Sequence, residues 1–177
     1  MMCWSVYKNR IALGAAAQCC ILVFGIIQGA YAQAPTSTAT TKLCGQKVDY
    51  TLAPPSPDVS TDLNKYLGVW SGHVIGVQSG YNVEYEMCVA YVIERIKADG
   101  TVYTQRINGD RSRVFANGVN YAVKPGVYHW LGKVVGNYLR IANDDGTFVQ
   151  ELHLTGTNLE GKHSDSKGAG FTKLTKQ

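Results

Sequence analysis

The sequence lacks the motifs of the common hydrolases and nucleotide-binding enzymes. It contains no Gly-x-Ser-x-Gly, no glycine-rich loop of the kind that cradles phosphate, and no His-Glu-x-x-His. A strong basic excess is also missing, because 17 lysines and arginines oppose 13 acidic residues. This balance is too weak to predict nucleic-acid binding. No amphipathic segment of helical period and useful length is present, so a helical domain is not expected.

Cysteine is sparse, and three of the five cysteines lie in a stretch organised like a secretory signal peptide. Lys8 and Arg10 precede an apolar run that ends at Ala30-Tyr31-Ala32. A basic region, an apolar stretch and a small-x-small site occur in this order in signal peptides. The alternative is a retained transmembrane anchor, because residues 11–30 approach the roughly 20 residues that span a bilayer. The cleavage site favours removal, and we expect residues 1–32 to be a signal peptide.

Removal of this leader leaves 145 residues with 15 basic and 13 acidic side chains, a net charge of +2. We therefore expect an exported protein, periplasmic or secreted, with no membrane span after signal removal. Cys44 and Cys88 then remain, and in an oxidising compartment they can form one disulfide. The alternative is two unpaired thiols. Neither has a cysteine or histidine nearby at ligand spacing, so we expect no metal and no cofactor.

The rest of the chain divides by composition into two parts. Residues 33–65 are rich in Thr, Ser, Ala, Pro and Lys, which predicts an irregular arm or linker. Residues 66–177 consist of short β-rich runs separated by turn signals such as Asp99-Gly100 and Asn108-Gly109-Asp110. Turns spaced by roughly 8 to 12 residues predict a sandwich or a barrel. An antiparallel up-and-down β-barrel is favoured, because closure removes exposed strand edges.

Alternation of apolar and polar residues identifies the expected inner face of several strands. Trp70 and Val74, for example, oppose His73. In the same way Trp130 opposes His129, and Phe148 opposes Glu151. Between Val89 and Ile96 both faces are largely apolar. This strand is therefore either central or covered on its outside by the arm.

The segment Leu67-Gly68-Val69-Trp70-Ser71-Gly72 resembles the start of the first strand in the calycin superfamily, the lipocalin-like barrels. The order GVWSG, CVAYVIERIKADGTVYTQ, VGNYLRI, DGTFVQELHL also resembles small exported bacterial barrels of uncharacterised function. The resemblance covers roughly residues 66–175. It implies that Trp70, which follows Gly68 at the strand start, packs across the closed end of the barrel. A basic residue of the last strand, Lys173 or Lys176, would lie over it.

Three arginines are candidates for binding an acidic head group. Arg106, Arg111 and Arg113 flank the predicted turn at residues 108–110, and across a hairpin they would converge at a barrel mouth. Arginine suits this task because its fork bonds two oxygens at once. The alternative is a solvated hairpin whose charges keep an edge soluble.

Tyrosines are candidates for lining a ligand cavity. An aromatic ring with a polar tip combines apolar area with a hydrogen-bonding group, although tyrosine is also an ordinary strand residue. Four tyrosines lie in segments with one face inside: Tyr85, Tyr91, Tyr103 and Tyr128.

These observations predict a non-enzymatic exported barrel that binds a small apolar or amphipathic molecule in its interior. Barrels of this size are wide enough only for side chains or one small ligand, so the sequence leaves open whether a cavity exists. The alternative is a protein-binding module or inhibitor of an exported enzyme, with residues 33–60 as an inserted arm. Some small bacterial calycin barrels inhibit secreted proteases in this way. A third hypothesis is an enzyme using Glu84, Tyr85 and Arg106, but no spacing demands it.

Overall fold

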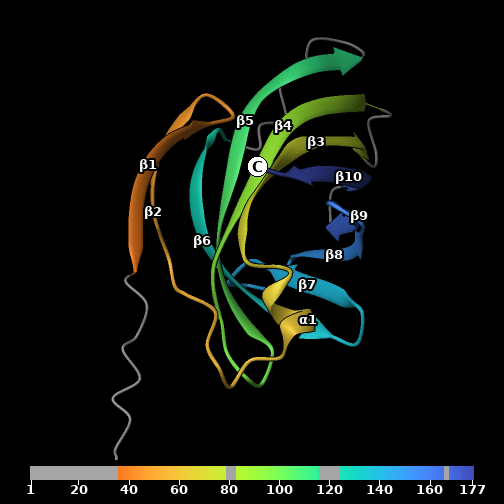
Figure 1. Ribbon diagram of the computed structural model, residues 1–177. Helices are drawn as coiled ribbons and strands as arrows, with labels where there is room; N and C mark the ends of the chain where they lie inside the picture. Colours follow the sequence, from red (N-terminus) through yellow and green to blue (C-terminus); the bar gives the residue numbers. More distant parts are fainter. Residues whose placement is uncertain (1–35, 79–82, 116–123, 166–167) are drawn as a thin grey trace, which may run out of the picture. The chain divides into compact units, whose positions relative to one another are not determined.

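The computed structural model describes residues 36–78, 83–115, 124–165 and 168–177, apart from the side chains at positions 78, 83, 111–115 and 165. Within these residues eight antiparallel strands form a closed barrel, in the order β10-β3-β4-β5-β6-β7-β8-β9 (Figure 1). Each strand pairs with the next in sequence, and β10 closes the barrel against β3. The predicted up-and-down barrel is therefore confirmed. The predicted signal peptide lies outside the described residues.

The elements follow one another along the chain with short connections. In order they are β1 (Ser37–Leu43), β2 (Gln46–Leu52), α1 (Thr61–Asn64), β3 (Gly68–Gln78), β4 (Val83–Ile96), β5 (Thr101–Phe115), β6 (Gly126–Val135), β7 (Tyr138–Ala142), β8 (Phe148–Thr155), β9 (Asn158–Asp165) and β10 (Gly168–Lys176). The Asp99-Gly100 turn joins β4 to β5 as expected. Gly100 has a φ of 83° there, which glycine adopts without strain.

Residues 37–52, expected as part of an irregular arm, form a hairpin of β1 and β2. Threonine is frequent in these strands, and its branched side chain favours extended backbone. The two residues between the strands, Cys44 and Gly45, have φ values of 49° and 83°. Positive φ at both positions is typical of the tight turn that suits the twist of a hairpin. The Thr- and Ser-rich composition concealed this regular structure.

The hairpin packs against the outer face of the barrel, where β2 contacts β4, β5 and β6 (Figure 1). Leu43 and Val48 form an apolar cluster with three barrel residues, Ala90, Val92 and Ile107. The segment from Val89 to Ile96 is therefore apolar on both faces because the hairpin covers its outer face. The predicted disulfide is confirmed: Cys44 in the turn is bonded to Cys88 of β4, with their Cα atoms 5.4 Å apart.

Strand β5 runs without interruption from Thr101 to Phe115, so the turn predicted at residues 108–110 is wrong. Gly109 lies instead beside the disulfide. A Cβ atom at this position would come within 2.9 Å of the Cys44 carbonyl oxygen and 3.1 Å of the Cys88 Cβ. The glycine is needed for close packing of the hairpin and not for a turn. Arg106, Arg111 and Arg113 therefore lie along one strand and do not converge across a hairpin.

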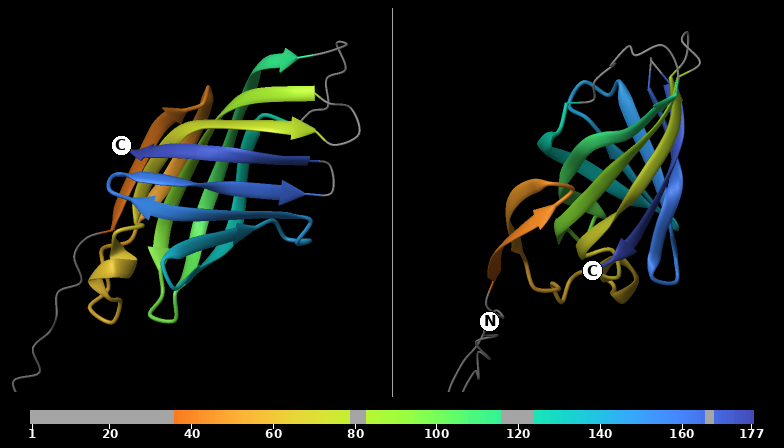
Figure 2. Two further views of the ribbon diagram at one scale, coloured as in Figure 1. Left: turned by 90° about the vertical axis from the view of Figure 1, so that its right-hand side faces the viewer. Right: turned by 90° about the horizontal axis from the view of Figure 1, so that it is seen from above.

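The end of the barrel beside α1 is covered by the segment between β2 and β3 (Figure 2). Val59 and Tyr66 of this segment belong to the same buried cluster as Trp70. The Trp70 Nε1 donates a hydrogen bond to the Tyr66 carbonyl oxygen at 2.8 Å. The Tyr66 hydroxyl in turn donates to the Asn137 carbonyl oxygen, between β6 and β7, at 3.1 Å. These bonds fix the closing segment to the first strand and to the opposite wall.

Of the two lysines considered for the position over Trp70, Lys176 occupies it. Its Nζ lies 5.2 Å from the centre of the Trp70 ring and donates to the Lys65 carbonyl oxygen at 3.0 Å. Lys173 is exposed on the outer face and pairs with Glu160 at 3.0 Å. The side chains of successive strand residues alternate between faces, so residues 173 and 176 lie on opposite faces of β10. Gly68 has a φ of 119° and leaves room for the Lys176 side chain.

Candidate functional site

The inward-facing residues of the barrel change from apolar to polar along the strands. Next to the closed end they are apolar, as at Leu159 of β9 and Leu174 of β10. Further along, they include a set of buried polar side chains: Thr104, Arg106, Asn108, Gln150, His163 and Thr172. The barrel therefore has an apolar base and a polar inner region beyond it.

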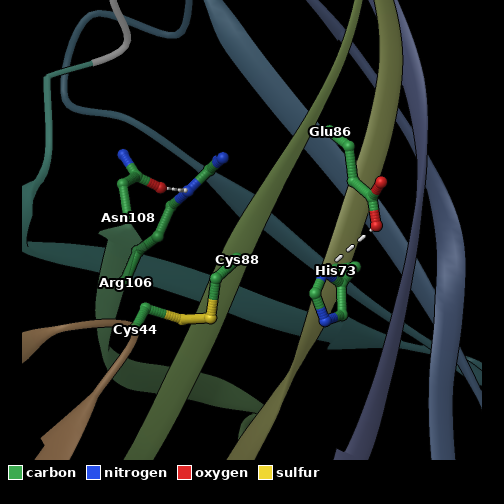
Figure 3. Close-up of a disulfide and its surroundings, with 6 residues drawn as sticks. All are labelled: Cys44, His73, Glu86, Cys88, Arg106 and Asn108. Atoms are coloured by element: carbon green, nitrogen blue, oxygen red, sulfur yellow. Dashed lines mark hydrogen bonds and ion pairs between the residues drawn. A yellow bond between two sulfur atoms is a disulfide. The ribbon is translucent and has the colours of Figure 1, made fainter. Parts of the chain in front are cut away.

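Arg106 is the charged member of this polar region. It lies on β5, and its register partners are Tyr91 of β4 and Tyr128 of β6. Its side chain is only 3% exposed, and its Nε donates a hydrogen bond to the Asn108 Oδ1 at 2.8 Å (Figure 3).

Aromatic rings surround the Arg106 guanidinium. Its central carbon lies 4.2 Å from the centre of the Phe148 ring, 4.8 Å from that of Trp130 and 5.8 Å from that of Tyr91. Ring faces attract a cation and offset part of the cost of burying it. Burial raises the pKa of the Tyr91 hydroxyl, and the nearby Arg106 charge opposes this increase only in part. Tyr91 is therefore neutral at physiological pH and supplies no counter-charge.

A chain of hydrogen bonds between neutral polar groups begins at Tyr91. The Tyr91 hydroxyl donates to the Gln150 Oε1, and the Gln150 Nε2 donates to the Thr172 hydroxyl. This chain crosses the interior from β4 through β8 to β10. Buried polar groups that are bonded in this way stabilise one arrangement of the core.

A second pair of side chains spans the wall formed by β3 and β10. The Tyr85 hydroxyl and the His163 Nε2 lie 2.9 Å apart and share a hydrogen bond. Each ring lies across a glycine: a Cβ atom on Gly76 would be 2.5 Å from the Tyr85 ring, and one on Gly170 would be 2.3 Å from His163. Gly76 and Gly170 are register partners. The two glycines therefore allow both rings to lie flat along the wall and meet.

Three aromatic residues face inward and are nevertheless partly exposed: Tyr128, Trp130 and Phe148. Their rings follow one another, with centres 6.3 Å apart between Tyr128 and Trp130 and 5.2 Å apart between Trp130 and Phe148. The Phe148 ring stacks on His163 at 5.4 Å. Inward-facing side chains of a fully packed core are buried. Their exposure shows that solvent reaches this part of the interior. We call these three residues the aromatic wall.

Four of the predicted site residues lie together in the interior: Tyr85, Tyr91, Arg106 and Tyr128. Tyr103 lies on the outer face, where the Arg95 guanidinium is 4.2 Å and the Lys97 Nζ 5.2 Å from its ring centre. A hydrogen bond with Lys97 is the main cause that lowers the pKa of Tyr103.

Two predicted arginines cannot be assigned to the site. Arg111 and Arg113 are register partners of Met87 and Glu86, and their side chains lie outside the described part of the chain.

Several residues of the site were not predicted: Asn108, Trp130, Phe148, Gln150, His163 and Thr172. For Trp130 and Phe148 the signal was present in the sequence, since alternation placed both on inner faces. Asn108 lies two positions from Arg106 on the same strand. The contacts of Gln150, His163 and Thr172 depend instead on how distant strands pair.

Among the described residues, no three His, Cys, Asp or Glu side chains are grouped so that they could hold a metal ion. No described helix has the length and apolar character needed to cross a membrane. His73, exposed on β3, has its Nδ1 3.4 Å from the Glu86 Oε1 (Figure 3).

Comparison with known proteins adds no assignment. No protein-family model matches this chain, and no curated protein matches it in sequence.

Proposed function

We propose that this protein is an exported, non-enzymatic barrel of calycin type that binds one small apolar or amphipathic molecule in its interior. The aromatic wall carries this proposal. Tyr128, Trp130 and Phe148 offer ring surface that faces inward and is still partly exposed to solvent. Apolar surface with a few placed polar groups is typical of small-molecule sites. Here the polar groups come from Arg106 and its neighbours.

The calycin assignment and export have independent support. Lys176 lies over Trp70 at the closed end, which is the arrangement implied by the resemblance to lipocalin-like barrels. The Cys44–Cys88 disulfide is compatible with an oxidising compartment, where such bonds persist. The signal-peptide pattern of residues 1–32 agrees with this location.

The alternative of an inhibitor with an inserted N-terminal arm is less well supported. It needs residues 33–60 to leave the barrel and enter a partner. Residues 37–52 are instead a hairpin held by a disulfide and by apolar contacts. Hydrogen bonds add to this attachment, from the Gln105 Nε2 to the Asp49 carbonyl oxygen at 3.0 Å and from the Thr51 amide to the Glu94 Oε1 at 3.1 Å.

Replacing Trp130 by alanine is expected to weaken binding of an apolar probe. The neutral dye N-phenyl-1-naphthylamine, whose emission rises in apolar surroundings, should bind at one molecule per chain. Trp130→Ala should weaken it about 10-fold, because a ring contact is worth roughly 1 to 1.5 kcal/mol.

The matched control is Leu131→Ala, which removes the neighbouring apolar side chain from the outer face, where it is 58% exposed. This variant should bind the dye within about twofold of the unmodified protein. Equal affinity of the two variants, or no dye binding at all, would contradict the proposal.

A further inference from the structure

Arg106 is a buried charge that has no counter-ion in the described part of the chain. It is 3% exposed, and no carboxylate of a described residue pairs with it. Its Nη1 is fully buried and has no hydrogen-bond acceptor there. The neutral Asn108 Oδ1 is the acceptor for the Nε.

This arrangement is energetically unfavourable in the empty protein. A buried ion must be paired or fully hydrogen-bonded to offset its loss of hydration. Buried donors without an acceptor are rare in native proteins, and each needs a specific explanation. The three rings around Arg106 compensate only part of the cost. By contrast, the polar groups of the Tyr91–Gln150–Thr172 chain are bonded to one another.

We propose that Arg106 binds the carboxylate of the ligand, so that the molecule bound in the barrel is a monocarboxylic acid with an apolar body. This inference rests on the proposed function and specifies its ligand class. Because the Nε is already used by Asn108, the buried Nη1, which has no acceptor among the described residues, is left to receive a carboxylate oxygen. Charge-assisted hydrogen bonds of this kind are roughly twice as strong as those between neutral groups.

The charge and shape of the surroundings specify the rest of the ligand. Lys176 lies at the closed end over Trp70. Arg106 carries one positive charge, so a single negative charge on the ligand balances it. Phe148 and Trp130 touch the guanidinium and are themselves partly exposed. An apolar chain attached to the bound carboxylate can thus continue along the aromatic wall.

The test compares dodecanoate with dodecanol as competitors for the bound naphthylamine dye. The two molecules have the same chain length and differ in the charged head group. The unmodified protein should bind dodecanoate about 10- to 100-fold more tightly, as expected for charge-assisted hydrogen bonds in a buried site. Arg106→Met should reduce the ratio of the two affinities to about 1, because methionine keeps the apolar stem and removes the charge. The control Arg140→Met removes an exposed arginine of β7 and should retain the preference.

The outcomes separate this inference from the proposed function. Equal binding of dodecanoate and dodecanol by the unmodified protein overturns the carboxylate assignment and leaves the proposed function standing. Failure of the dye and both competitors to bind overturns the proposed function, and this inference with it. The melting temperature of ligand-free Arg106→Met gives a second readout. It should not fall below that of the unmodified protein, since the variant loses an unpaired buried charge. A clear decrease, with the acid preference retained in an Arg106→Gln variant, would assign Arg106 a structural role instead.

Discussion

Replacing Cys44 and Cys88 together by alanine is expected to lower the free energy of unfolding by about 4 kcal/mol. The disulfide closes a loop of 44 residues, and the loop entropy that it removes from the unfolded chain corresponds to this value. In the folded state the apolar cluster under the hairpin remains. The variant should therefore keep the barrel and lose stability. Urea unfolding of the oxidised protein and of the variant measures the difference.

Reduction of the unmodified protein provides the control for the disulfide prediction. With dithiothreitol present, its urea midpoint should approach that of the double-alanine variant, and the variant itself should not respond to the reductant. Equal midpoints of the oxidised protein and the variant would show that the disulfide does not stabilise the fold.

Trp70→Ala is expected to lower the free energy of unfolding by about 3 to 5 kcal/mol, the range for removing a buried aromatic side chain. Trp70 is 1% exposed. It also donates a hydrogen bond to the Tyr66 carbonyl oxygen and supports Lys176. Its loss leaves a cavity between the barrel wall and the segment that closes this end. Thermal and urea unfolding both report the effect.

The matched control for Trp70 is Trp130→Ala, which truncates the same residue type where it is partly exposed. This change should lower the free energy of unfolding clearly less than Trp70→Ala does, because less apolar area returns to water. A larger loss of stability at Trp130 than at Trp70 would contradict the assignment of Trp70 as the residue that packs the closed end.

The barrel was predictable because its signals are local. Alternation of apolar and polar residues follows the period of two in a strand, and the Asp99-Gly100 turn has the local chemistry of a hairpin. The same residue types at Asn108-Gly109-Asp110 led to a wrong prediction of a turn. There the glycine is required by contact with Cys44. Cys44 is 65 positions away in the sequence, so a local sequence pattern cannot indicate this contact.

The hairpin of residues 37–52 was concealed for a related reason. Its strands bury one face against the barrel, and the partners on that face, Ala90, Val92 and Ile107, are distant in sequence. The sequence signal for this packing was in the barrel strand that the hairpin covers. The segment from Val89 to Ile96 is apolar on both faces, and covering by the arm was one of its two interpretations.

The sequence indicated which residue types face the interior, but not all of the residues that form the site. Residues 103 and 106 are an odd number of positions apart in β5, so alternation alone places Tyr103 and Arg106 on opposite faces. By contrast, the pairing of Tyr85 with His163 depends on Gly76 facing Gly170. That register follows from barrel closure, which no local pattern specifies.

The central claim is that the ligand lies inside the barrel against the aromatic wall. Nuclear Overhauser effects between the methylene protons of dodecanoate and the protein side chains test it most directly. We predict effects to the ring protons of Trp130 and Phe148. Effects confined to outer-face residues such as Ile75 and Phe171, which are 59% and 47% exposed, would contradict the claim.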